Sequence, residues 1–158
     1  MIALAFLASV AVVPAGQTFT CTPTRVWDAD GPIWCAEGPR VRLDGIAARE
    51  MDGDCLPGHP CPAMEPLAAR ARLVGILAPA RTQQLKSRHI ALEGAPSLTC
   101  KSSGSAKGNR TGAICNTTAN DDIGCALIRA GAALEWPRYS GGRYADCRPP
   151  RKYQSDAW

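Results

Sequence analysis

The chain has 158 residues, of which 46% are hydrophobic and 20% charged, and its formal net charge is +4. This length suits one domain with a modest hydrophobic core but not two independent cores. The composition excludes intrinsic disorder and collagen-like structure, and we find neither an internal repeat nor a linker between domains. The mild positive charge favours polyanionic partners such as nucleic acid, but it is too common to single out one function.

An uncharged apolar segment, residues 2–13, opens the chain and is followed by the small residues of 14–16. The segment is too short to span a bilayer but has the length of the apolar part of a secretory signal peptide. No Lys or Arg precedes it, so a buried N-terminal strand or helix is the alternative. We predict a signal peptide over residues 1–17, a mature domain over 18–158, and a secreted or periplasmic protein without a membrane span after cleavage.

All eight cysteines follow this segment, and their even number predicts a disulfide framework in an oxidising compartment. Spacing alone leaves about 105 full pairings open. We predict sequential pairing, in which each bridge closes a short loop worth about 2–4 kcal/mol: Cys21–Cys35, Cys55–Cys61, Cys100–Cys115 and Cys125–Cys147. Zinc is the competing explanation, but there is no Cys-x-x-Cys pair, and His59 and His89 are isolated loop residues without an assigned role.

The first half of the mature chain predicts a three-stranded meander. Residues 18–26 are rich in Thr and β-branched residues, a turn follows at 28–32, and strands resume over 33–35 and 40–46. A loop rich in Gly and Pro, residues 52–62, comes next, and a Cys55–Cys61 bridge would close it.

A helix is predicted over residues 65–77, with Pro66 in its first turn and Pro79 after its end. Apolar residues recur along it at helical spacing: Leu67, Ala71, Val74 and Leu77 or Ala78.

Further strands are predicted over residues 89–92 and 97–101 and around 112–116, with a flexible basic loop over 102–110 before the last of them.

A short amphipathic helix over residues 123–130 has Asp121 or Asp122 as its N-cap and Gly131 at its end. The tail from Tyr139 is rich in Gly, Arg and Pro, and Pro149–Pro150 prevents one continuous helix there. This order of elements predicts an α+β, mainly β fold, a five-stranded Greek-key barrel of the OB type with two to three helices and disulfide bridges. Other small α+β folds fit the order nearly as well.

Four segments carry residues with catalytic chemistry. They are the acids Asp28 and Asp30 in a turn that ends a strand, Arg42 on a strand with Glu50 just past its end, the basic turn from Lys107 to Arg110, and the helix end of residues 127–131 followed by Trp136 and Tyr139.

In order and spacing, these segments resemble the thermonuclease family of staphylococcal-nuclease-like domains over residues 26–139. The family's landmarks are an Asp-x-Asp turn, an Arg-Leu strand leading to a short acidic motif, a Gly-Arg turn and a Leu-Val-Arg-x-Gly helix end. The resemblance implies an OB-fold enzyme that cleaves DNA and RNA with the help of Ca²⁺, and we expect it to act as a monomer.

The resemblance also assigns roles to single residues. Arg42 and Arg110 would grip the scissile phosphate, and Glu50 would be the general base for the attacking water. Two guanidiniums stabilise the negative charge that grows on the phosphate, and a carboxylate takes the proton from water.

Further roles concern metal and substrate. Asp30 matches a metal-ligating aspartate, with Asp28 beside it, and oxygen ligands suit Ca²⁺. Tyr139 falls where a tyrosine lines the nucleotide pocket, and Lys107 belongs to the basic turn that contacts substrate.

The chain departs from the family pattern close to these positions. Ala47 stands where the family has a second metal-ligating aspartate, and Arg49 stands where it usually has proline. The loss of a ligand predicts weaker metal binding or a changed metal preference. We hypothesise that Asp44, which shares a strand face with Arg42, joins Asp30 in a two-carboxylate site.

Three functions remain open from the sequence. The first is a metal-dependent nuclease, the second a catalytically silent OB-fold module that binds nucleic acid or another anionic partner, and the third a structural or partner-binding envelope protein. Ala47 favours the silent module. The joint presence of Arg42, Glu50 and Arg110 favours the enzyme, because a pure binding module needs no base between two phosphate-binding arginines. We therefore predict the nuclease.

Overall fold

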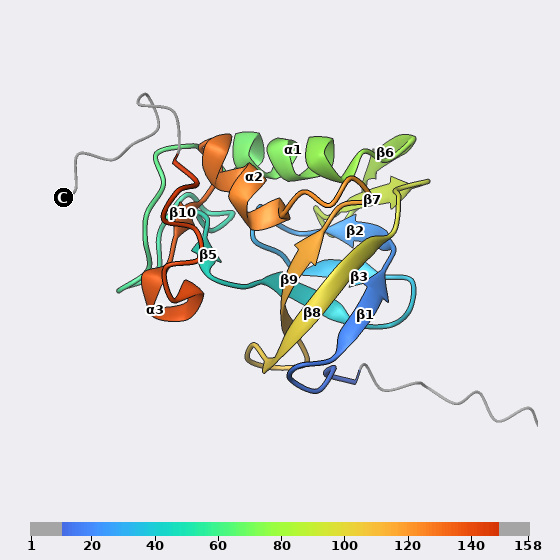
Figure 1. Cartoon of the computed structure of the whole chain (residues 1–158). Helices are drawn as coiled ribbons and strands as arrows, with labels where there is room; N and C mark the ends of the chain where they lie inside the picture. The colour runs from blue at the N-terminus through green and yellow to red at the C-terminus, as the bar shows by residue number, and fades with distance from the viewer. Residues whose placement is uncertain (1–10, 149–158) are drawn as a thin grey trace, which may run out of the picture.

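The computed structural model describes residues 11–148, so most of the predicted signal segment (2–10) and Pro149–Pro150 lie outside the described residues (Figure 1). The described chain is mainly β with three helices: α1 (Pro66–Leu77), α2 (Ile123–Arg129) and α3 (Pro137–Ser140). Its strands are β1 (Thr18–Cys21), β2 (Pro23–Val26), β3 (Ile33–Cys35), β4 (Arg40–Leu43), β5 (Ile46–Ala47), β6 (Arg81–Gln84), β7 (Ile90–Glu93), β8 (Leu98–Ser105), β9 (Thr111–Asn116) and β10 (Leu134–Glu135).

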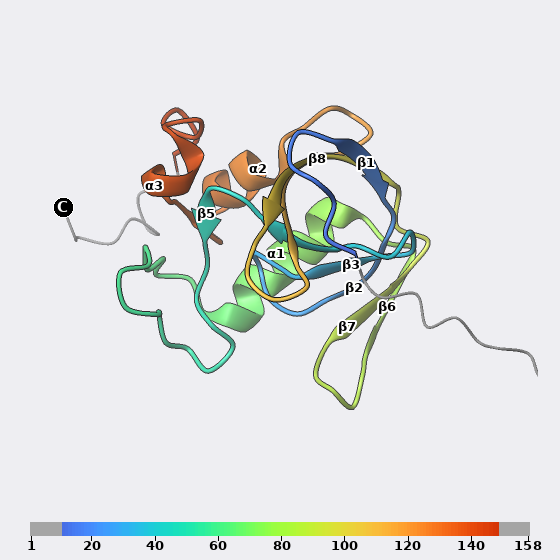
Figure 2. The same cartoon turned by 90° about the horizontal axis from the view of Figure 1, so that it is seen from below.

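Eight of these strands form one open sheet in the order β1-β8-β9-β4-β3-β2-β7-β6, and β5 pairs separately with β10. The β4–β9 pair is parallel, and the other pairs are antiparallel. Helices α1 and α2 lie together over one end of the sheet in Figure 1, and the β6–β7 hairpin projects from the rest in Figure 2. The β2–β3–β4 meander is as predicted from the turn residues between its strands.

The predicted strand over 18–26 is wrong in one respect, because it consists of two strands that pair with different neighbours. Thr22 separates them, and its backbone N–H donates to Glu37 Oε2 (2.7 Å) rather than to a neighbouring strand. Pro23, which has no N–H, follows directly. As a result β1 pairs with β8, whereas β2 pairs with β3 and β7.

Two strand segments after α1 differ from the sequence prediction. β6 was not expected, because all four of its residues, Arg81–Gln84, are exposed and show no apolar alternation. It forms through backbone pairing with β7 in a hairpin. β8 continues to Ser105 through residues predicted to be a flexible loop, because β9 provides backbone partners over that length.

Helix α1 has the predicted position but buries a different face. Leu67 is 63% exposed, and the buried residues are Pro66, Ala69, Arg70, Leu73 and Leu77. The reason is Arg70, which is buried because its Nη1 donates to the carbonyls of Trp27 (3.2 Å) and Arg88 (2.8 Å). An arginine with such partners belongs to the packed face, which apolar periodicity does not reveal.

Helix α2 agrees with the sequence at both ends. The Asp122 carboxylate accepts a hydrogen bond from Cys125 N (3.1 Å), as an N-cap does, and Gly131 follows the helix with φ +76°.

All four predicted disulfides are confirmed: Cys21–Cys35, Cys55–Cys61, Cys100–Cys115 and Cys125–Cys147. They join β1 to β3, close the loop before α1, link the paired strands β8 and β9, and tie α2 to the C-terminal tail. Four disulfides fit a protein of an oxidising compartment. Within residues 11–148, no helix combines the length and apolar character needed to cross a bilayer.

The turn between β4 and β5 brings the C-terminal segment against the end of β4. Trp136 N donates to Gly45 O (2.7 Å), and Gly45 has φ +74°. A Cβ on Gly45 would lie 2.8 Å from Ser140 Cβ and 3.0 Å from Ser140 Cα. Only glycine therefore fits here, and the segment that carries Trp136 packs directly on this backbone.

We expect Gly45→Ala to lower the free energy of unfolding by about 3 kcal/mol, because a left-handed backbone costs alanine about 1–2 kcal/mol and the contact with Ser140 adds steric strain. Gly108→Ala is the matched control, since Gly108 has φ +62° but no neighbour within 4 Å of its would-be Cβ. Urea denaturation of both variants measures the difference. Equal losses would contradict close packing of Ser140 on Gly45.

Candidate functional site

Arg42 and Asp30 form an ion pair at the end of β4. Arg42 Nη2 lies 3.1 Å from Asp30 Oδ2, and the two side chains are only 15% and 14% exposed. Arg42 Nη1 also donates to the carbonyls of Leu43 and Ile46. The guanidinium is therefore held in one orientation by the strand end and the turn that follows it.

Asp30 connects the turn after β2 to the segment after β5. Its Oδ2 accepts a second hydrogen bond from Ala48 N (3.0 Å), and its carbonyl accepts one from Leu43 N (2.9 Å). Ala47, one residue earlier, is fully buried and pairs with Leu134 of β10. Position 47 therefore supplies no oxygen ligand, in agreement with the loss noted in the sequence.

Asp28 is a buried acid beside this ion pair. It is 5% exposed, and its Oδ1 has no hydrogen-bond partner in the described structure. Burial, followed by the charge of Asp30 and a hydrogen bond with it, raises the pKa of Asp28 well above its ordinary value. A buried carboxyl next to a second acid takes up a proton or a cation to relieve this cost.

Glu50 is close enough to Asp28, Asp30 and Arg42 for their charges to interact. Burial, and then the charge of Asp30, raises the pKa of Glu50, while His59 and Arg42 act in the opposite direction. The side chain is half-buried. A carboxylate whose pKa is moved toward neutrality is suited to accept a proton from water.

Arg49, beside Glu50, is directed to the loop before α1. Its Nε donates to Pro62 O (2.7 Å) and its Nη1 to Gly53 O (2.7 Å). Its charge is thereby used to hold the 52–62 loop.

Aromatic rings lie next to Arg42. Trp136 has ring-centroid distances of 4.2 Å to His59 and 4.6 Å to Tyr139, and we call these three residues the aromatic cluster. The Arg42 guanidinium carbon lies 6.0 Å from the Trp136 ring centroid. Tyr139 is 55% exposed, so the cluster reaches the surface.

His59 was missed by the sequence analysis, which gave it no role. It stands in the loop closed by Cys55–Cys61, and its charge acts on Glu50. No spacing rule links it to Trp136, because the contact joins segments 77 residues apart along the chain. The one sequence signal for a role of His59 was its position between Cys55 and Cys61, shortly after Glu50.

Arg110 and Lys107 lie in the turn between β8 and β9. Arg110 Nε donates to Lys107 O (3.3 Å), and neither side chain forms an ion pair with another described residue. Thr111, which follows Arg110, pairs with Val41 of β4. The strand register thus places this basic turn beside the start of β4, with both cations uncompensated.

Asp44 lies beside β9. Its Oδ1 is 3.2 Å from where a Cβ on Gly112 would be, and Asp44 is not among the charges that shift the pKa of Asp28 or Glu50. No group of three or more His, Cys, Asp or Glu side chains able to hold a metal ion occurs among the described residues. The oxygen donors that fit a divalent ion best are Asp28, with its unpartnered buried oxygen, and Asp30.

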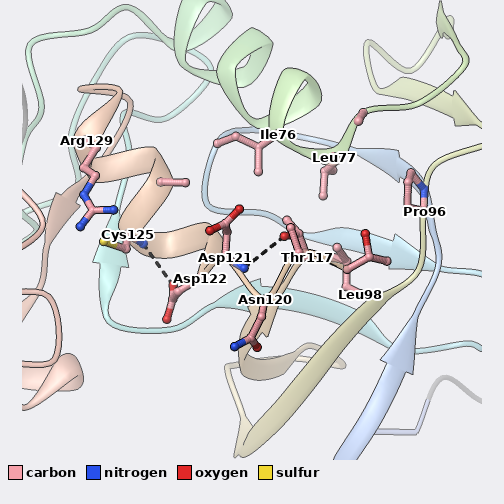
Figure 3. Close-up of a pocket in the computed structure, with 14 residues that line it drawn as sticks. Ile76, Leu77, Pro96, Leu98, Thr117, Asn120, Asp121, Asp122, Cys125 and Arg129 are labelled. Carbon is pink, nitrogen blue, oxygen red and sulfur yellow. Dashed lines mark hydrogen bonds between the residues drawn. The ribbon is translucent and has the colours of Figure 1, made fainter.

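A separate cavity lies between the end of α1, the start of α2 and the ends of β8 and β9 (Figure 3). It combines apolar side chains such as Ile76 and Leu98 with Asp122 and Arg129. The Asp122 carboxylate already accepts hydrogen bonds from Cys125 N and Tyr144 Oη. This acid is thereby occupied in holding the fold, and none of the predicted catalytic, metal-binding or substrate-binding residues lines the cavity.

Compared with known proteins, the chain matches no family model and no curated protein.

We expect Asp28→Asn to stabilise the metal-free protein at pH 7 by about 1 kcal/mol or more, because it removes a buried carboxyl that resists ionisation. The raised pKa means that the native state binds more protons than the unfolded state above about pH 4. The free energy of unfolding of the wild type should therefore fall as pH rises from the pKa of Asp28 in the unfolded state to its pKa in the native state. Over the same range, the stability advantage of Asp28→Asn should grow. Urea denaturation in EDTA at several pH values measures this.

Asp54→Asn is the control for that series, because Asp54 is exposed and forms no ion pair with a described residue. A constant difference between Asp28→Asn and wild type at every pH would show that Asp28 ionises normally.

Proposed function

We propose that this protein is an exported nuclease of the thermonuclease type, which hydrolyses phosphodiester bonds of DNA or RNA by attack of water. The observation that carries the proposal is the meeting of Arg42, Asp30 and Glu50 at the end of β4. These residues come from two of the four segments that resemble the family. The apolar N-terminal segment and the four disulfides support export.

In the proposed reaction, Glu50 accepts a proton from a water molecule whose oxygen bonds to phosphorus. The bond from phosphorus to the leaving ester oxygen breaks, and that oxygen takes up a proton. Arg42, held by Asp30 and two backbone carbonyls, stabilises the added negative charge without a reorientation of its own. Arg110, in the turn beside β4, is the second cation for the same phosphate.

A divalent ion, which we expect to be Ca²⁺, belongs to the proposal. Asp28 and Asp30 would hold it, and it would supply further positive charge next to the phosphate. Replacement of the second metal-ligating aspartate of the family by Ala47 predicts weaker binding than in a site that keeps both aspartates.

We also propose that β1 and β2 act as two halves of one bent strand in an OB-type barrel. Strands β1 and β2 are consecutive and are separated by Thr22 alone. With residues 18–26 taken as one strand, the pairing order becomes that of a ring of five strands, 18–26, β3, β4, β9 and β8, with one parallel pair. This ring is the arrangement that the OB fold has.

One observation favours the alternative of a silent module that binds nucleic acid or another anion. Asp30 Oδ2 is already occupied by Arg42 and Ala48 N, and Ala47 leaves no ligand at its side. A phosphate would still find Arg42 in place. Binding and catalysis are therefore to be measured separately.

For the nuclease, we expect the oxidised mature domain to cleave single-stranded or double-stranded DNA in Ca²⁺ or Mg²⁺ but not in EDTA. Glu50→Gln should lower kcat at least 100-fold, because it removes the base. Arg42→Lys should lower kcat roughly 100- to 1000-fold, because lysine keeps the positive charge but lacks the planar guanidinium that can donate to two phosphate oxygens at once. The release of acid-soluble nucleotides measures the rates.

Glu65→Gln and Arg72→Gln are the controls, since both residues are exposed and lie on or next to α1, and they should retain wild-type rates. Absence of cleavage with every metal, together with binding of DNA that weakens steeply with salt, would replace the enzyme by the silent module.

A further inference from the structure

A row of side chains on three neighbouring strands places Trp34 between two arginines. Trp34 of β3 is the register partner of Arg25 on β2 and of Arg40 on β4. The guanidinium carbon of Arg25 lies 4.4 Å from the Trp34 ring centroid, and that of Arg40 lies 5.5 Å from it. Both distances are those of cation–π contacts.

A second tryptophan and a third arginine extend this row. The His89 ring lies 4.8 Å from the ring centroids of both Trp27 and Trp34, and thus links them. The Arg88 guanidinium carbon lies 5.7 Å from the Trp27 ring centroid. We call Arg25, Arg40, Arg88, Trp27 and Trp34, with His89 between the tryptophans, the arginine–tryptophan surface.

The surface is held in shape by a buried charged residue beneath it. Arg70 of α1 is only 5% exposed and donates to the backbone carbonyls of Trp27 and Arg88. Trp27 follows the end of β2, and Arg88 precedes the start of β7. Burial, and then the charge of Arg25, lowers the pKa of His89, in keeping with positive charge gathered around it.

No acid of the described chain neutralises this surface. The ion pairs within residues 11–148 involve Arg42 and Arg143, and none involves Arg25, Arg40 or Arg88. Arg40 Nε is also without a hydrogen-bond acceptor in the described structure. Three cations held close together without an acid favour an anion with several charges.

The surface continues into the candidate site. Arg40 precedes Arg42 by two residues on β4, so both side chains stand on one face of the sheet about 7 Å apart along the strand. Trp27 is the residue directly before Asp28. A chain of phosphates bound at Arg42 therefore has the arginine–tryptophan surface beside it.

We infer that the arginine–tryptophan surface binds the phosphate backbone of a nucleic acid on one side of the cleaved bond. The inference rests on the proposed function. A guanidinium stacked on an indole ring keeps its N–H edge free for phosphate oxygens. Because arginines already cover the tryptophan rings, the backbone rather than the bases supplies the main contact.

The test compares Arg25→Gln/Arg88→Gln with the control Arg72→Gln/Lys101→Gln, which removes two exposed cations elsewhere. Binding of a fluorescent 20-nucleotide single strand is measured by anisotropy in EDTA at several salt concentrations. Loss of two phosphate contacts should reduce the slope of log affinity against log salt by about 1.4 and weaken binding about tenfold at low salt. The control should keep the wild-type slope.

Cleavage kinetics provide a second readout. The double variant should show a raised KM for the 20-nucleotide strand with unchanged kcat, and unchanged kinetics on a dinucleotide too short to reach the surface. Circular dichroism should show the wild-type far-UV spectrum and one cooperative thermal transition, since the replaced side chains lie on the surface and only their cation–π contacts are lost.

The outcomes separate this inference from the proposed function. Equal slopes for both double variants, with cleavage intact, would overturn the inference and leave the nuclease standing. A slope that depends on Arg25 and Arg88 in a protein that never cleaves would uphold the surface and refute the nuclease. Absence of any oligonucleotide binding by the wild type would overturn the inference directly.

Discussion

The nearly buried ion pair of Arg42 and Asp30 is the interaction on which the arrangement of the site depends. Moving two charged groups out of water costs roughly several kcal/mol per ion unless each group forms further hydrogen bonds. Here the partners are backbone groups of the segments on either side of the β4–β5 turn: the carbonyls of Leu43 and Ile46 accept from Arg42, and Ala48 N donates to Asp30. The pair thus joins these segments, and Asp28, Glu50 and the aromatic cluster occupy the places that remain around it.

This arrangement separates charge along one strand. Near the start of β4, arginines without an acidic partner surround Trp34, whereas acidic residues lie near the end of β4. Burial, and then the charge of Asp30, raises the pKa of Asp28 and of Glu50, and the arginines leave the surface open to anions. A polyanion lying along the strand would meet favourable potential there and carboxyl groups at the end of the strand.

The sequence sufficed for features that depend on local signals. The meander and both longer helices follow from turn residues and from residues at the helix ends. The four disulfides agree with the predicted sequential pairing, although spacing alone left other pairings open. The sequence was insufficient where the local structure depends on a residue far away along the chain. Glu37 accepts the N–H of Thr22 where β1 ends, and β7 pairs with the polar strand β6. Arg70 donates to backbone carbonyls outside its own helix. For the site, Arg42, Asp30 and Glu50 were predicted together, but the contact between His59 and Trp136 has no counterpart in any spacing.

The loop that carries His59 is fastened twice, by the Cys55–Cys61 bridge and by Arg49 on the carbonyls of Gly53 and Pro62. One of these fastenings forms only under oxidation. A newly made chain in a reducing cytoplasm has Arg49 alone to hold the loop, so His59 is less firmly placed against Trp136. The aromatic cluster is therefore completed only in an oxidising compartment, where the Cys55–Cys61 bridge can form.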